Sequence, residues 1–208
     1  MGFVEQFLLV AVAHLMGVAS PGPDFAIVVK NSVNSGRKSA IYTSLGISTG
    51  ILIHVSYCIA GVGIIINSSE ILFNILKTAG ALYLGYIGVK SLTLATKCNE
   101  VYFAQENKLK NKMEAYKNGL FVNLLNPKAT LFFLAVFTTI LRKDSVVEYK
   151  IIFGIYMAVA TMCWFSMVSF LFGIKRVRDL FIRYNNSFEK IMGVIFITFG
   201  ILTFFAKK

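Results

Sequence analysis

Two short polar stretches interrupt an otherwise apolar sequence, and each places a charged side chain beside proline. The first is "SPGPDF" (Ser20–Phe25), and the second is "NPK" (Asn126–Lys128). Proline lacks a backbone N–H and clashes with the carbonyl four residues earlier, so a regular helix cannot continue through either stretch. A helix that begins at such a break inside a membrane exposes free N–H groups and the positive end of its dipole, which favour an anionic partner. Both stretches are therefore candidate binding sites for a small charged solute.

The candidate substrate-binding residues are those of the two breaks together with one asparagine before the second break. They are Ser20, Pro21, Gly22, Pro23, Asp24, Asn123, Asn126, Pro127 and Lys128. Ser20 and Asn126 are residue types that cap helices, and a proline fits the first helical turn. New helices are therefore expected to begin at Pro21 and Pro127. The first of them is expected to end just before Gly36, which suits a C-cap.

Two functions and one structural role are open for Asp24. An ionisable residue within a membrane span costs about 2.5–3.5 kcal/mol on insertion scales, which makes a functional role the default hypothesis. The carboxylate could exchange a proton, or it could bind the ammonium group of a solute. Alternatively, Asp24 lies at the membrane edge and stabilises the N-terminus of the new helix. Lys128 either meets a carboxylate or extends its side chain toward the membrane surface.

One face of the second long apolar segment carries two glycines and a histidine. Gly46, Gly50 and His54 are spaced by four residues, so each lies one helical turn from the next. The glycines predict close helix packing. His54, like Asp24, is a proton-coupling candidate. A histidine hydrogen-bonded to a neighbouring helix explains the same pattern, and both interpretations stay open. For His14, in the first segment, we favour packing over function.

Long apolar segments must position these groups. The hydrophobic fraction of the chain is 56%, and only 15% of its residues are charged. Residues 39–69 and 151–174 contain no Asp, Glu, Lys or Arg, and about 20 apolar residues suffice to cross a bilayer as a helix. We therefore predict an all-α integral membrane protein with six transmembrane helices. They are expected at about 3–29, 40–66, 71–93, 116–141, 151–174 and 187–206.

The two halves of the chain share one organisation. We expect a single transmembrane domain with repeat one at about 1–95, a cytoplasmic linker at 96–115 and repeat two at about 116–208. The first span of each half carries a break, so spans 1 and 4 are the broken ones. Paired Pro-interrupted segments of this kind point to the substrate site of a membrane transporter. Asn74 and Lys77 make the third segment the least apolar, which leaves a five-span alternative open.

The net charge of +11 follows the connections between the predicted spans. Fourteen Lys and Arg flank the first, third and fifth connections, and six lie on the opposite side. Because cytoplasmic loops are enriched in Lys and Arg, both termini are predicted on the periplasmic or outer side, and no nucleic-acid partner is expected. Cys58, Cys98 and Cys163 have no CxxC spacing, so neither a disulfide framework nor a metal site is predicted.

Other functional classes have less support. Two histidines are too few for a histidine-rich metal centre, and no GxSG or GxGD motif of an intramembrane protease is present. Neither an enzyme nor a cofactor is therefore expected. A passive channel stays an alternative, because broken helices also build selectivity filters. Ionisable residues beside the breaks favour a coupled carrier instead.

Five segments, in this order, resemble the LysE/RhtB family of amino-acid exporters. They are "SPGPDF" (20–25), "SGRKSA" (35–40), "GISTGILIH" (46–54), "KTAGALYLGYIGVKSL" (77–92) and "GLFVNLLNPKATLFFL" (119–134). The resemblance covers nearly the whole chain. It implies a bacterial inner-membrane protein with a 3+3 inverted repeat, coupled to protons and assembled as a homodimer. Many members carry an Asp three residues before a Trp in span five, whereas Thr161 precedes Trp164 here.

From the residues and the resemblance together, we expect a secondary exporter of amino acids or amino-acid-like solutes that works by alternating access. Its expected partners are the solute, protons and membrane lipid. A passive channel, or an exporter of a non-amino-acid solute or a cation, is the alternative. If the span-five Asp helps bind protons or cations in relatives, this chain must use another group or another substrate.

Overall fold

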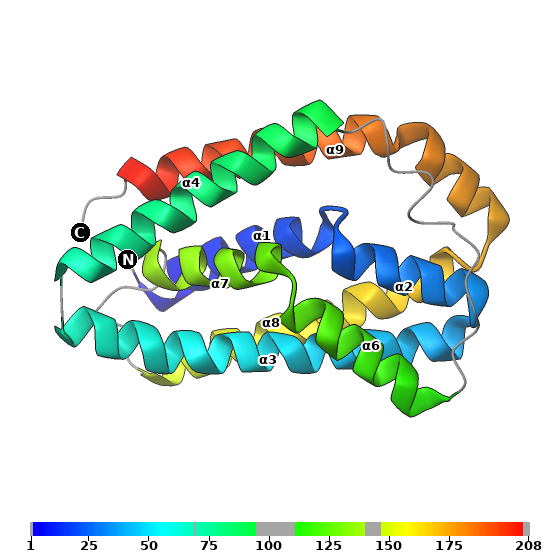
Figure 1. Cartoon of the computed structure of the whole chain (residues 1–208), viewed down its shortest axis with the longest axis horizontal. Helices are drawn as coiled ribbons and strands as arrows, with labels where there is room; N and C mark the ends of the chain where they lie inside the picture. Colours follow the sequence, from blue (N-terminus) through cyan, green and yellow to red (C-terminus); the bar gives the residue numbers. More distant parts are fainter. Residues whose placement is uncertain (1, 69, 95–110, 140–146, 206–208) are drawn as a thin grey trace.

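The computed structural model describes residues 2–68, 70–94, 111–139 and 147–205, and this part of the chain contains helices and no strand (Figure 1). Its helices are α1 (Phe3–Ala19), α2 (Pro23–Asn34), α3 (Arg37–Ser68), α4 (Glu70–Leu94), α6 (Lys112–Leu124), α7 (Pro127–Thr139), α8 (Val147–Leu171) and α9 (Lys175–Phe205). The predicted all-α class is confirmed. Most of the predicted linker, Cys98 and the end of the fourth predicted span lie outside the described residues.

The helices follow one long axis, and α1 begins at the end of the molecule where α9 ends (Figure 1). In the first half, α1 and α2 lead away from this end, α3 returns to it, and α4 leads away again. In the second half, α6 and α7 lead back toward it, α8 leads away, and α9 returns. The main contacts join α4 to α9, and α3 to both α6 and α8.

Both Pro-containing segments bend sharply. α1 and α2 are inclined by 53°, and α6 and α7 by 57°. Each bent pair is long and apolar enough to cross a membrane as one span. Two unbroken stretches, Arg37–Gly61 in α3 and Val147–Leu171 in α8, pass the same test on their own. By length and composition, the described residues thus contain two membrane-crossing helices, or up to four if each bent pair is one span.

The first break is built differently from the expectation. α2 begins at Pro23, with Gly22 as its N-cap. The prediction that Ser20 caps a helix starting at Pro21 is therefore wrong. Ser20 instead ends α1, and its hydroxyl donates to the carbonyl of Pro21 at 3.3 Å. The chain uses its second proline for the first turn of α2, where the missing N–H has no helical partner to lose.

Other helix ends follow local side-chain signals. The side-chain oxygen of Asn126 accepts from the N–H of Lys128 at 3.0 Å and caps α7. Gly36 follows α2 with a φ of 87°, a left-handed conformation that glycine adopts without strain. Asn111 accepts from the N–H of Glu114 at 2.8 Å, so α6 begins at 112, before the apolar segment expected from 116.

Glycines bring α3 and α6 into backbone contact. A Cβ on Gly46 of α3, or on Gly119 of α6, would collide with a main-chain carbonyl of the other helix. One turn along α3, a Cβ on Gly50 would collide with the side-chain oxygen of Asn123. α3 therefore holds α6 closely and leaves room for the asparagine that precedes the second break.

Two hydrophobic clusters fill the interior, one on each side of the helix breaks. The larger includes Val10, Ile51, Val55, Phe132, Phe133, Phe153 and Met157. The other includes Phe25, Val28, Val29, Ile47, Phe165, Val168 and Phe172. The polar groups of the breaks lie between them.

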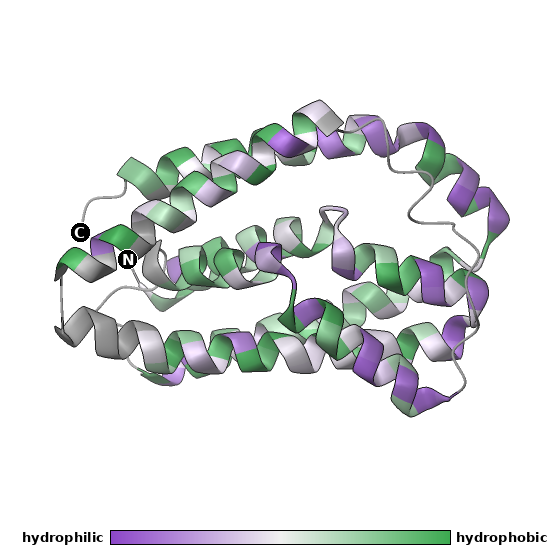
Figure 2. Cartoon of the chain, in the orientation of Figure 1, coloured by the Kyte–Doolittle hydropathy of each residue, from purple (hydrophilic) through white to green (hydrophobic). Residues whose placement is uncertain are grey.

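Hydrophilic residues gather at one end of the molecule, opposite the start of α1 (Figure 2). The end of α2 and the first turns of α6 and α9 meet there. Among the described residues at this end, the basic ones are Lys30 of α2, Arg37 and Lys38 in the first turn of α3, Lys112 and Lys117 of α6, and Lys175, Arg176, Arg178 and Arg183 of α9. α9 begins at Lys175, earlier than the span expected from 187, because its charged first turns are helical too.

Candidate functional site

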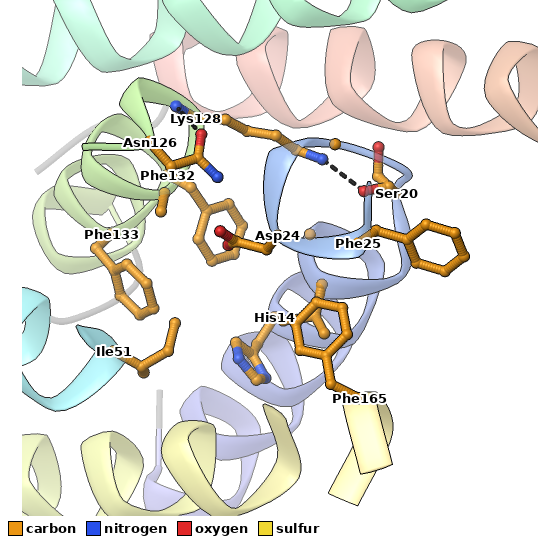
Figure 3. A pocket seen from close by; sticks show the side chains of 14 residues that line it. His14, Ser20, Asp24, Phe25, Ile51, Asn126, Lys128, Phe132, Phe133 and Phe165 are labelled. Carbon is orange, nitrogen blue, oxygen red and sulfur yellow. Dashed lines mark hydrogen bonds between the residues drawn. The ribbon is translucent and has the colours of Figure 1, made fainter. Parts of the chain in front are cut away.

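A small cavity lies between the two hydrophobic clusters, at the point where α1, α2 and α7 meet (Figure 3). Its volume is about 40 Å³, room for a few water molecules. Its polar wall consists of His14, Ser20, Asp24, Asn126 and Lys128. Its apolar wall includes Phe25, Ile51, Phe132, Phe133 and Phe165.

Asp24 lies in the first turn of α2 and connects the two halves of the chain. The side-chain amide of Asn123, at the end of α6, donates to Oδ2 of Asp24 at 2.9 Å. The side chains of Asn126 and Lys128 interact with the same carboxylate. Its second oxygen, Oδ1, is buried and has no hydrogen-bond partner. This oxygen can therefore accept a hydrogen bond from a bound molecule.

Lys128 reaches back from the first turn of α7 to the first break. Its Nζ donates to the carbonyl oxygen of Ser20 at 2.8 Å and to that of Pro21 at 3.1 Å. These carbonyls follow the end of α1, where a helix leaves acceptors unsatisfied. The ammonium also lies 5.2 Å from the ring centre of Phe196 in α9, and the charges of Asp24 and Glu189 act on it. Lys128 thus ties together both breaks and α9.

The N-termini of α2 and α7 face the same region. Gly22 caps α2 and Asn126 caps α7, and both caps line the cavity. A Cβ on Gly22 would lie 3.2 Å from Nζ of Lys128, so a larger residue there would crowd the ammonium. Two helix N-termini and an ammonium create a positive region, and Asp24 adds one negative charge beside it. The site suits a molecule that carries both charges.

His54 lies outside the cavity wall. Its Nε2 is 3.2 Å from the carbonyl oxygen of Asn123, and its Nδ1 bonds the Tyr57 hydroxyl. The ring stacks on Phe133 with a centroid distance of 5.5 Å. Through Asn123, which bonds Asp24 with its side chain and His54 with its main chain, the two candidate proton groups are connected.

The structure divides the candidate residues into two groups. Ser20, Gly22, Asp24, Asn126 and Lys128 line the cavity. Pro21, Pro23, Asn123 and Pro127 do not line it. Of these, Asn123 is fully buried and holds Asp24. The prolines shape the backbone at the breaks.

His14 is the cavity residue for which the sequence favoured a packing role. Its ring is only 1% exposed, and Nε2 lies 3.0 Å from the hydroxyl oxygen of Thr161 in α8. Nδ1 is buried without a hydrogen-bond partner. An isolated histidine in an apolar helix gives no local signal that distinguishes packing from function. The sequence also carries no local signal for the phenylalanines of the wall, or for Glu189 of α9, whose charge acts on Lys128.

Within the described residues, no group of three or more His, Cys, Asp or Glu is arranged to hold a metal ion. The groups that line the cavity are a carboxylate, an ammonium, an imidazole and two helix N-termini, which can bind a molecule through ionic contacts and hydrogen bonds.

Comparison with known proteins agrees with this picture. The threonine efflux protein of Escherichia coli (strain K12) is 32% identical over 198 residues, which cover 94% of this chain and 95% of that protein. The threonine efflux protein of Salmonella typhi is 30% identical over the same shares. An uncharacterized membrane protein of Bacillus subtilis (strain 168) is 28% identical over 195 residues, 90% of this chain and 93% of that protein. No solved structure matches the chain.

The family model for the LysE type translocator matches residues 15–206, which include both breaks and every polar residue of the cavity except His14. The family and the threonine efflux relatives are transporters and not enzymes. The chain belongs to the LysE type translocator family and is a transmembrane transport protein.

Proposed function

We propose that this protein is a secondary exporter of amino acids or closely related solutes across the bacterial inner membrane. The observation that carries the proposal is the pairing of opposite charges, Asp24 and Lys128, on the wall of one cavity between two helix breaks. Relatives named threonine efflux protein support an amino-acid substrate. A zwitterion is the smallest solute that satisfies both charges.

The solute's carboxylate binds at the N-termini of α2 and α7, near Lys128. Its ammonium binds Oδ1 of Asp24, the oxygen that lacks a partner. Gly22, Asn126 and Ser20 complete this part of the wall, while Asn123 holds the other carboxylate oxygen at 2.9 Å. A charge-assisted contact to a buried carboxylate is stronger than one to a neutral acceptor, so Asp24 is expected to dominate affinity.

The chain is proposed to form one domain of six spans, arranged as a 3+3 inverted repeat. Ser20-Pro21 and Asn126-Pro127 stand 106 residues apart. Gly88 of α4 and Gly193 of α9 stand 105 apart, and a Cβ on either would collide with the other's carbonyl oxygen, at 2.6 and 2.7 Å. Nearly equal offsets, 106 and 105 residues, therefore relate the breaks and the glycines of a close helix contact. The basic end faces the cytoplasm, both termini face outward, and the protein forms a homodimer.

Alternating access is proposed to use two aromatic clusters, one that supplies Phe25 to the cavity wall and one whose Tyr156 packs against His14 of that wall. The Phe25 cluster (Phe25, Phe172 and Phe181) has centroid distances of 5.0–5.4 Å and lies toward the basic end. The Phe7 cluster (Phe3, Phe7, Tyr149, Phe153 and Tyr156) joins α1 to α8 at the other end. Opening the first cluster would admit solute from the cytoplasm, and opening the second would release it outside.

Protons entering the cell are proposed to drive export. Asp24 is the group proposed to exchange the proton, and the groups that face it are Asn123, Asn126 and Lys128. His54 is the second candidate, because it bonds the main chain of Asn123. Protonated Asp24 would release the solute's ammonium, and deprotonated Asp24 would bind it, which couples the two movements.

Dipeptide loading tests the proposed function. Cells expressing the protein, and cells with an empty vector, are fed dipeptides that cover the amino acids, and each free amino acid outside is followed over time. Faster efflux of one group, lost when the proton gradient is collapsed, is the expected result. Efflux that persists without the gradient would indicate a passive channel. No change for any amino acid, with the protein present in the membrane, would point to another solute or a cation.

A further inference from the structure

We propose that His14, held by Thr161, contacts the side chain of the exported solute and selects amino acids whose side chain forms a hydrogen bond. The inference rests on the proposed function and adds a specificity-determining residue to it. The contact involves α1 and α8, and not the Pro-containing breaks that bind the charged groups.

His14 has one nitrogen that is bonded and one that is free. Nε2 lies 3.0 Å from Oγ1 of Thr161, a residue with no exposed surface. Nδ1 is buried without a partner, although the ring belongs to the cavity wall. The rings of His14 and Tyr156 lie edge to face at a centroid distance of 6.1 Å. Nδ1 is therefore the atom left to bond a molecule in the cavity.

The position of His14 suits the side chain of a solute. In Figure 3, Asp24 lies between Lys128 on one side and His14 on the other. With the carboxylate near Lys128 and the ammonium at Asp24, the third substituent of the α-carbon points toward His14. His14 precedes Ser20 by six residues, so a rise of 1.5 Å per residue places them about 9 Å apart along the axis of α1.

The walls around His14 are apolar and close. A Cβ on Gly17, nearly one turn along α1, would lie 3.0 Å from the ring of Phe132. Ile51 and Phe165 border the same cavity. Gly17, Ile51, Phe132 and Phe165 have no hydrogen-bonding side chain, so His14 is the polar side chain of this part of the wall.

Hydrogen bonding to His14 is expected to produce a large preference for solutes with a hydrogen-bonding side chain over solutes with an apolar one. An apolar side chain would displace water from His14 and leave Nδ1 buried and unbonded, whereas a hydrogen-bonding one would satisfy it. A site built to bond a hydroxyl rejects the analogue that lacks it far more strongly than an apolar pocket rejects an added hydroxyl. A hydroxyl both donates and accepts, so it fits Nδ1 whichever ring nitrogen carries the proton.

The test compares threonine with valine, which has nearly the same shape. Exchange of each labelled amino acid is measured in proteoliposomes that contain wild type, His14→Phe or Thr161→Val. Wild type is expected to favour threonine by about tenfold or more. His14→Phe, which keeps the ring but removes both nitrogens, is expected to bring the ratio close to one. Thr161→Val, which frees the imidazole, is expected to give a ratio between those of wild type and His14→Phe.

Thr49→Val is the matched control, because the Thr49 hydroxyl is exposed and bonds only the Leu45 carbonyl of its own helix. It is expected to leave the ratio unchanged. An unchanged ratio in both His14→Phe and Thr161→Val would overturn the assignment of His14 while leaving amino-acid export intact. If His14→Phe does not assemble, Thr161→Val alone decides. Absence of exchange for every amino acid in wild type would instead contradict the proposed function.

Discussion

Nζ of Lys128 lies 2.8 Å from the carbonyl oxygen of Ser20, although 108 residues separate them in the chain. The contact joins the start of α7 to the end of α1, so the two helix breaks are directly hydrogen-bonded to each other. The same ammonium also donates to the carbonyl oxygen of Pro21 at 3.1 Å, so it supplies a donor to both carbonyls that follow α1. Lys128 therefore has a structural role in addition to its proposed contact with the solute.

Replacing Lys128 by methionine should destabilise the protein as well as reduce export. The carbonyls of Ser20 and Pro21 would each lose a donor, at a cost of about 1–3 kcal/mol per group. The apparent Tm in detergent should fall by roughly 2–4 °C for each kcal/mol lost. Lys117→Met, at an exposed position of α6, is the control and should leave Tm unchanged. Equal Tm values for the two variants would show that the contact does not stabilise the breaks.

The helix breaks and some helix ends could be predicted from the sequence, because local chemistry determines them. Proline cannot continue a helix, so both breaks were predictable, as were the cap at Asn126 and the end of α2 just before Gly36. Two nearby prolines allow two starting points, which is why the cap at Ser20 was predicted wrongly. The start of α6 was missed because Asn111 and its signal lie before the apolar segment.

Contacts between residues far apart in the chain could not be predicted from local sequence patterns. The bond between Lys128 and Ser20 depends on where α7 lies relative to α1, which no local pattern encodes. His14 shows the same limit, because its partner Thr161 is 147 residues away. In the sequence, Thr161 stands out only as the position at which many members of the family carry Asp, and the structure adds His14 as the residue that it contacts.

The contact between α3 and α6 should tolerate no side chain at Gly46. Gly46→Ala would push a methyl group into a main-chain carbonyl of α6, so the helices must separate or the protein loses stability. We expect a lower Tm and reduced export. Gly61→Ala in the same helix is the control, since a Cβ there meets nothing within 4 Å. If both variants behave like wild type, α3 and α6 are not packed as described.

Reporter fusions should reveal the orientation of the chain. The basic residues at one end of the molecule predict that this end is cytoplasmic and that α9 ends on the outer side (Figure 2). A C-terminal alkaline phosphatase should therefore be active and a C-terminal green fluorescent protein dark. The reverse pattern would show that the orientation, or the number of spans, is wrong.

Export should respond to the direction of the proton gradient. Because protons are proposed to enter as solute leaves, acidifying the outside should accelerate export, and making the outside alkaline should slow it. His54→Gln is expected to keep this response, since an amide can still donate to the Asn123 carbonyl that His54 bonds. The response is measured as the rate of efflux at several external pH values, in wild type and in His54→Gln. Loss of the response in His54→Gln would assign the proton to His54 instead of Asp24.

The most direct test of the central claim, that Asp24 binds the ammonium group of the solute, is counterflow in proteoliposomes. This exchange of labelled for unlabelled amino acid needs no proton gradient, so it reports binding and movement of the solute separately from coupling. We predict that Asp24→Asn abolishes exchange, whereas Glu148→Gln, at an exposed position in the first turn of α8, keeps it. Exchange at the wild-type rate in Asp24→Asn, with the same substrate affinity, would contradict the assignment.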